Sequence, residues 1–226
     1  MTLKEITDIA QNVPIILASL FAIYGFDAWR REHVGVRRIE LAEEVLALFY
    51  QARDAIESIR SPFGFGGEGQ TRKPNENETA EEKEALDQAY VLIERYNKHS
   101  ELFSRIHSLR YKFMALLGQE AAQPFDELNK IVNELLFASH QMARLAKQPL
   151  RHFNSEAEEK KDRVNYLKTD RVYYAGGDDD PIAPRVNQTI SSIEETCRHI
   201  IESKSTLFSI INTPLTKFVI SKRRSH

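Results

Sequence analysis

The feature that most limits what this chain can fold into is a stretch without any charged side chain, residues 9–26. A helix of this length extends about 27 Å, which is close to the thickness of the hydrocarbon core of a bilayer. The stretch therefore predicts a transmembrane anchor within residues 1–28. The side chains expected to contact lipid or the membrane interface are Val13, Ile15, Ile16, Leu17, Leu20, Phe21, Ile23, Tyr24, Phe26 and Trp29.

Two alternatives to an anchor compete for this stretch. A buried core helix is one, because the strongly apolar part covers only residues 13–26, but a core helix normally carries a polar face and this one has almost none. A cleaved signal peptide is the other. Its first residues should be basic, whereas Lys4 is outnumbered by Glu5 and Asp8, and no clear cleavage site follows.

Arginines after the stretch predict its orientation. Arg30, Arg31, Arg37 and Arg38 follow it closely, and only Lys4 precedes it. Positive side chains are retained on the cytoplasmic side of a membrane. The sequence thus predicts a single-pass protein, such as one of a bacterial inner membrane, with its N-terminus outside and its C-terminal domain in the cytoplasm.

The rest of the chain shows the periodicity of amphipathic helices, with apolar residues at spacings of three and four. The first such stripe is expected to form a helix–helix interface, with self-association as one version, and consists of Ala42, Val45, Phe49, Ala52, Ile56 and Ile59. After it, residues 61–78 are rich in Gly, Pro and Asn and predict a flexible loop.

Local signals mark the later helices. Thr79 and Glu82 form a capping box, which predicts the start of a helix of nearly forty residues, up to Gly118. Pro124 fits the start of the next helix. Residues 150–183 form a polar connector with one short exposed helix, and a last helix precedes a basic tail at 214–226.

These elements, without any sustained strand-like alternation, predict an all-α protein. We expect the single N-terminal transmembrane helix to be followed by an elongated antiparallel bundle of about four long helices, with coiled-coil-like seams, in a cytoplasmic domain of residues 29–213. The basic tail could contact anionic lipid, although an ordinary frayed end explains it more simply.

Composition argues against several classes of function. The formal net charge is −2, and residues 28–226 hold equal numbers of basic and acidic side chains, so no basic stripe favours nucleic acid. Cys197 is the only cysteine, which excludes an internal disulfide and multi-cysteine metal sites. No motif for metal, nucleophilic or dinucleotide chemistry stands in the right context, so neither an enzyme nor a cofactor is expected.

Two short motifs have a structural and a functional interpretation. The dinucleotide-binding motif G-x-G-x-x-G is matched in sequence by Gly64, Gly66 and Gly69. However, a helix is expected before them, where this motif requires a strand. Asp178, Asp179 and Asp180 are weak candidates for a divalent cation, and the simpler interpretation is that Asp180 caps the following helix.

The sequence thus favours a membrane-anchored helical scaffold or interaction protein, with the lipid bilayer and a protein, or a second copy, as partners. The alternative is a membrane-linked sensor or effector in stress or defence that binds a ligand through its loops, and an uncharacterised enzyme ranks third.

Overall fold

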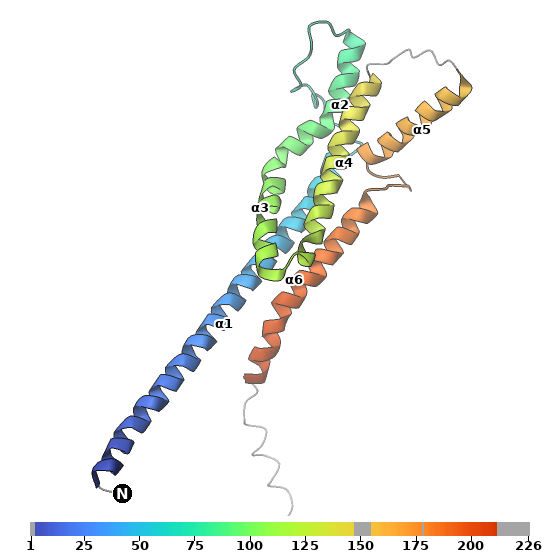
Figure 1. Cartoon of the computed structure of the whole chain (residues 1–226). Coiled ribbons are helices and arrows are strands. Elements are labelled where there is room, and N and C mark those ends of the chain that lie inside the picture. Colours follow the sequence, from blue (N-terminus) through green and yellow to red (C-terminus); the bar gives the residue numbers. More distant parts are fainter. Residues whose placement is uncertain (1–2, 147–154, 178, 212–226) are drawn as a thin grey trace, which may run out of the picture. The chain divides into compact units, whose positions relative to one another are not determined.

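The computed structural model of the protein describes residues 3–146, 155–177 and 179–211, with side chains described for residues 17, 18, 21–26 and, in those ranges, 29–202. The described residues form helices and no strand, which confirms the predicted all-α class (Figure 1). The elements are α1 (Leu3–Ile59), α2 (Ala80–Lys98), α3 (Ser100–Leu117), the 3₁₀ helix η1 (Glu120–Ala122), α4 (Gln123–Ala146), α5 (Glu156–Tyr173) and α6 (Ala183–Ile211).

The helices divide into two units. One unit comprises residues 1–43 and 199–226, and the other, here called the bundle, comprises residues 44–198. Helices α1 and α6 contribute to both units, whereas α2, α3, η1, α4 and α5 belong to the bundle alone. The aromatic tip and the two hollows described below lie within the bundle.

The described helices do not show the predicted membrane span. Where the chain is described, none of its helices combines the length and the apolar character that crossing a bilayer requires. Several side chains of the predicted span, including those of Val13, Ile15, Ile16 and Leu20, lie outside the described residues. The transmembrane part of the predicted fold therefore stays a prediction.

The long helix predicted to run from Thr79 to Gly118 is wrong as a single element. The Thr79–Glu82 capping box is confirmed, but α2 ends at Lys98. His99 adopts φ −109° and ψ 8°, outside the helical region, and α3 starts at Ser100. Because of this break, the bundle contains more and shorter helices than the sequence predicts.

An aromatic cluster forms the centre of the bundle. The rings of Phe49 on α1 and Phe125 on α4 lie 4.9 Å apart at 81°, and Phe113 on α3 lies 5.2 Å from Phe125. All three side chains are buried. The edge-to-face packing of Phe49 and Phe125 adds about 1 kcal/mol to the hydrophobic gain.

Helix α4 packs against both α2 and α5 (Figure 1). Ser139 on α4 donates a hydrogen bond of 2.6 Å to the carbonyl of Ala89 on α2. Helix α5 is polar, and among its residues only Tyr173 is buried, with its hydroxyl donating to the Gln88 carbonyl at 2.7 Å. Buried hydroxyls thus satisfy their hydrogen-bonding needs on the backbone of α2.

A buried guanidinium joins the end of α1 to the connection between α5 and α6. Arg60 is 2% exposed, and its Nη1 and Nη2 each lie 2.9 Å from a carboxylate oxygen of Asp180. It also donates to three backbone carbonyls at the end of α5, those of Arg171 and Val172 in the last turn and that of Tyr174 just after it. In return, the carbonyl of Arg60 accepts a hydrogen bond from the amide of Ala175.

We predict that Arg60→Ala lowers the free energy of unfolding by roughly 3 to 5 kcal/mol, because it leaves a buried carboxylate and several carbonyls without their donor. Arg53 is a matched control, since its ion pair with Asp54 is exposed, and Arg53→Ala should cost less than about 1 kcal/mol. Urea unfolding of the full chain in mild detergent, followed by circular dichroism, measures both. Similar losses for the two variants would contradict the role given to Arg60.

Candidate functional site

The most conspicuous surface feature of the bundle is a pair of exposed aromatic side chains in the loop between α1 and α2. Phe63 is 83% exposed and Phe65 is 82% exposed. This pair is called the aromatic tip below. Large apolar side chains that remain in water cost free energy unless a partner covers them, so a contiguous pair is a candidate for binding.

Arg95 on α2 holds the backbone beneath the tip. Its side chain is buried, with Nη1 donating to the Ser61 carbonyl at 2.7 Å and Nη2 donating to the Phe63 carbonyl at 2.8 Å. The same guanidinium binds both carboxylate oxygens of Glu68, at 3.1 and 2.6 Å. One charge on α2 therefore positions the first half of the loop.

Glu68 in turn fixes the backbone of Phe65. Its carboxylate accepts a hydrogen bond from the Phe65 amide at 3.1 Å, and its own amide donates to the Phe65 carbonyl at 3.2 Å. The hydrogen bond from Arg95 holds the pKa of Glu68 below its usual range, although burial acts in the opposite direction. The carboxylate is thus ionised at neutral pH and keeps the tip in place.

The second half of the loop is joined to α2 as well. The Gly69 amide and the Thr71 hydroxyl both donate to one oxygen of Glu94, at 2.9 and 2.8 Å. Arg72 pairs with Glu78 at 2.6 Å and with Asp87 at 2.8 Å. Composition predicts flexibility for residues 61–78, whereas these contacts connect the loop to α2 at several points.

Gly69 is required at its position for a steric reason. It has φ +85°, and a Cβ there would lie 2.0 Å from the carbonyl oxygen of Asp87. Only glycine allows so close an approach of two backbones. Among Gly64, Gly66 and Gly69 only the third thus has a steric reason to be glycine, and no helix opens there, since α2 begins at Ala80.

A hollow of about 520 Å³ lies beside the aromatic tip, lined by both phenylalanines and by Asp54, Glu57 and Lys98 among others. Lys98 forms an ion pair with Glu94 on its own helix. Glu57 is exposed, and no ion pair is recorded for it in the described part of the bundle. The uncompensated charge next to the tip is therefore negative.

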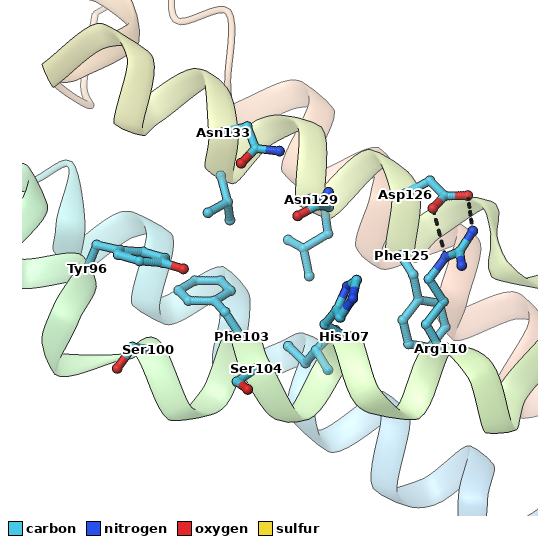
Figure 2. Close-up of a pocket in the computed structure, with 13 residues that line it drawn as sticks. Tyr96, Ser100, Phe103, Ser104, His107, Arg110, Phe125, Asp126, Asn129 and Asn133 are labelled. Carbon is cyan, nitrogen blue, oxygen red and sulfur yellow. Dashed lines mark hydrogen bonds and ion pairs between the residues drawn. The ribbon is translucent and has the colours of Figure 1, made fainter. Parts of the chain in front are cut away.

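A second hollow, of about 490 Å³, runs between α3 and α4 (Figure 2). Its floor consists of the buried apolar side chains Phe103, Ile106, Phe125, Leu128 and Val132. Its polar rim is formed from α2 and α3 by Tyr96, Ser100, Ser104 and His107, and from α4 by Asn129 and Asn133. At one end the ion pair of Arg110 and Asp126 lines the groove, with bonds of 2.8 and 3.1 Å.

The predicted interface stripe on α1 is entirely buried within the chain. The six side chains have exposures of 0 to 2%: Ala42, Val45, Phe49, Ala52, Ile56 and Ile59. The stripe therefore forms intramolecular packing, as the contact of Phe49 with Phe125 illustrates.

The acidic cluster is divided between different roles. Asp180 caps α6, as predicted, because its Oδ1 accepts hydrogen bonds from the amides of Ile182 and Ala183. Asp179 forms an exposed pair with Arg171 at 3.2 Å, and Asp178 lies outside the described residues. Within the described ranges no group of side chains could hold a metal ion.

The side chains of the predicted anchor that the structure describes are exposed. Leu17, Phe21, Ile23, Tyr24, Phe26 and Trp29 are all exposed. The four topology arginines, Arg30, Arg31, Arg37 and Arg38, are exposed as well. The basic tail at 214–226 lies outside the described residues.

Cys197 offers no reactive thiol. It is fully buried on α6, and burial raises its pKa to about 12, so a thiolate does not form near neutral pH.

Neither the aromatic tip nor the α3–α4 groove is predicted from the sequence. Phe63 and Phe65 stand in a glycine-rich run, and two aromatic residues in such a run are the signal that could have indicated an exposed binding element. The groove depends on the break at His99, which no Gly or Pro announces.

The chain matches no family model, no curated protein and no solved structure.

We predict that the amide of Phe65 loses hydrogen-exchange protection by roughly tenfold or more in Glu68→Gln, because a charge-assisted hydrogen bond is replaced by a weaker neutral one. Glu81→Gln, an exposed position at the start of α2, should leave this protection unchanged. Exchange measured by NMR on the full chain distinguishes the two.

The same contact predicts a pH dependence. The pKa of Glu68 is lower in the folded chain than its ordinary value of 4.5, so its stabilising effect is complete above that pH and is lost as the pH falls through the folded pKa. Protection of the Phe65 amide should therefore decline in acid in the native chain and change much less in Glu68→Gln. An equal decline in both would contradict the assignment.

Proposed function

We propose that this chain is a membrane-anchored helical interaction protein that docks a partner protein through the aromatic tip. The observation that carries the proposal is the pair Phe63 and Phe65, more than four-fifths exposed on a loop whose backbone is fixed by Arg95 and Glu68. A rigid loop that presents apolar side chains loses little conformational entropy on binding.

The chemistry around the tip favours a particular kind of partner surface. Two phenylalanine side chains fit an apolar cleft, and buried aromatic residues are common anchors of protein interfaces. Asp54 and Glu57 line the adjacent hollow, so a cleft with a basic rim matches the tip in charge. The proposed role is one of binding, without a reaction.

Support for the anchor comes from the distribution of apolar side chains on α1. At 100° per residue, Leu17, Phe21, Ile23, Tyr24, Phe26 and Trp29 point in directions all around the helix. A helix that is apolar around its circumference suits lipid better than an interface with water.

Aromatic residues at the end of the uncharged stretch add to this support. The rings of Phe26, Trp29 and His33 succeed one another at 5.8 and 5.6 Å, just before Arg37 and Arg38. Aromatic residues followed by arginines are typical of the membrane interface on the cytoplasmic side. The bundle would then face the cytoplasm, with the N-terminus outside.

We predict that a photo-crosslinking phenylalanine analogue at position 63 of the full chain, expressed in cells, forms a discrete adduct with a partner protein, whereas the same analogue at position 137 does not. Phe137 is a matched control, because it is 62% exposed but stands on helix α4 and not in the loop. The mass of the adduct distinguishes a second copy of the chain from another protein.

The adduct should be lost when Phe65→Ser or Glu57→Lys is added, and thermal stability should stay the same because both side chains are exposed. No adduct at position 63, or equal adducts at positions 63 and 137, would contradict docking through the tip.

We predict that a tag on the N-terminus is accessible in intact cells and that a tag on the C-terminus becomes accessible only after permeabilisation. Replacing Arg30, Arg31, Arg37 and Arg38 with Gln should mix the two orientations, because it removes the charge asymmetry. Arg53→Gln, farther from the stretch, is the control and should have no effect. Release of the native chain by an alkaline wash would contradict the anchor.

A further inference from the structure

We propose that the groove between α3 and α4 binds a neutral, planar nitrogen heterocycle of nucleoside size, with a purine as the preferred base. This inference is independent of the aromatic tip, since it concerns another face of the bundle. It rests on the size of the groove, on its aromatic floor, on its lack of net charge and on its rim of amides and hydroxyls (Figure 2).

The groove stays open because small side chains line it on α3. On α3 the rim residues Ser100 and Ser104 are one turn apart, and both are small. A volume of about 490 Å³ falls within the range of small-molecule sites in proteins.

Aromatic side chains offer a surface for stacking. The rings of Tyr96 and Phe103 lie 5.5 Å apart and within 20° of parallel. The two rings thus cover one face of each other, and Phe103 and Phe125 are buried, so a base would stack on the face of Tyr96 that is turned away from Phe103. A flat heterocycle covers such a surface better than a branched aliphatic ligand does, because every base has a π-face to stack.

The polar groups on the rim are available to a ligand. Within the described part of the chain, the side-chain amides of Asn129 and Asn133 and the hydroxyl of Tyr96 make no hydrogen bond to protein. An asparagine amide offers one donor and one acceptor side by side, which matches the N6 and N7 edge of adenine. Two such amides one turn apart on α4 can orient a base.

The charge of the groove selects against a phosphate. Arg110 is neutralised by the bidentate pair with Asp126, and its pKa is raised by that hydrogen bond. No other Lys, Arg, Asp or Glu lines the groove. A neutral nucleoside therefore avoids the cost of bringing a phosphate dianion to an uncharged surface.

The test is binding of adenosine, guanosine, cytidine and uridine to the full chain in mild detergent, measured by equilibrium dialysis. We expect adenosine or guanosine to bind with a Kd of about 1 mM or tighter. Adenosine monophosphate should bind no more tightly than adenosine. Absence of nucleoside binding at about 5 mM, or tighter binding of the monophosphate, would overturn the proposal.

Two variants and two controls place the ligand in the groove. The double change Asn129→Ala and Asn133→Ala should weaken binding roughly tenfold by removing two hydrogen bonds, and Ser104→Trp should abolish binding by filling the space. Asn165→Ala and Ser191→Trp, exposed positions on α5 and α6, should leave the Kd unchanged. All these side chains are exposed, so the fold is retained, and equal effects of variants and controls would overturn the assignment.

Discussion

The guanidinium of Arg60 brings a full positive charge into the interior of the bundle. The packing around the end of α1 depends on the groups that neutralise this charge and accept its hydrogen bonds. Asp180, 120 residues away in the sequence, supplies the opposite charge, and the last carbonyls of α5 supply the remaining acceptors. Burial acts to raise the pKa of Asp180, but the hydrogen bonds from Arg60 and from the amides of α6 outweigh it, so the pKa lies below the ordinary value. One carboxylate thus closes a buried ion pair and starts a helix.

Arg95 repeats the arrangement on the other side of the α1 terminus. Both arginines bind the backbone that leaves a helix end, where carbonyl groups lack intrahelical partners. The two arginines bind different segments. Arg60 holds the polar helix α5 to the rest of the bundle, whereas Arg95 positions the aromatic tip. The proposed docking surface and the fold therefore rest on the same kind of bond.

Local and periodic features of this chain could be predicted from its sequence. The Thr79–Glu82 capping box, the Asp180 cap and the buried stripe of α1 follow from residues that are close in the chain. The burial of Arg60 and Arg95 could not be predicted, because a charged side chain is buried only when distant partners exist. The break at His99 was missed as well, since Lys98 and Ser100 are ordinary helix residues and packing overrides weak propensity.

The close contact of Gly69 with the carbonyl of Asp87 also constrains how the loop can change in length. Between Ser61 and Gly69 the chain is fixed at both ends, so an inserted residue would displace the aromatic tip or separate the two backbones. Residues 73–77 are exposed and lie beyond Gly69, between Arg72 and its partner Glu78, and insertions there would leave the tip where it is. The loop can thus change in length without displacing the aromatic tip only on the C-terminal side of Gly69.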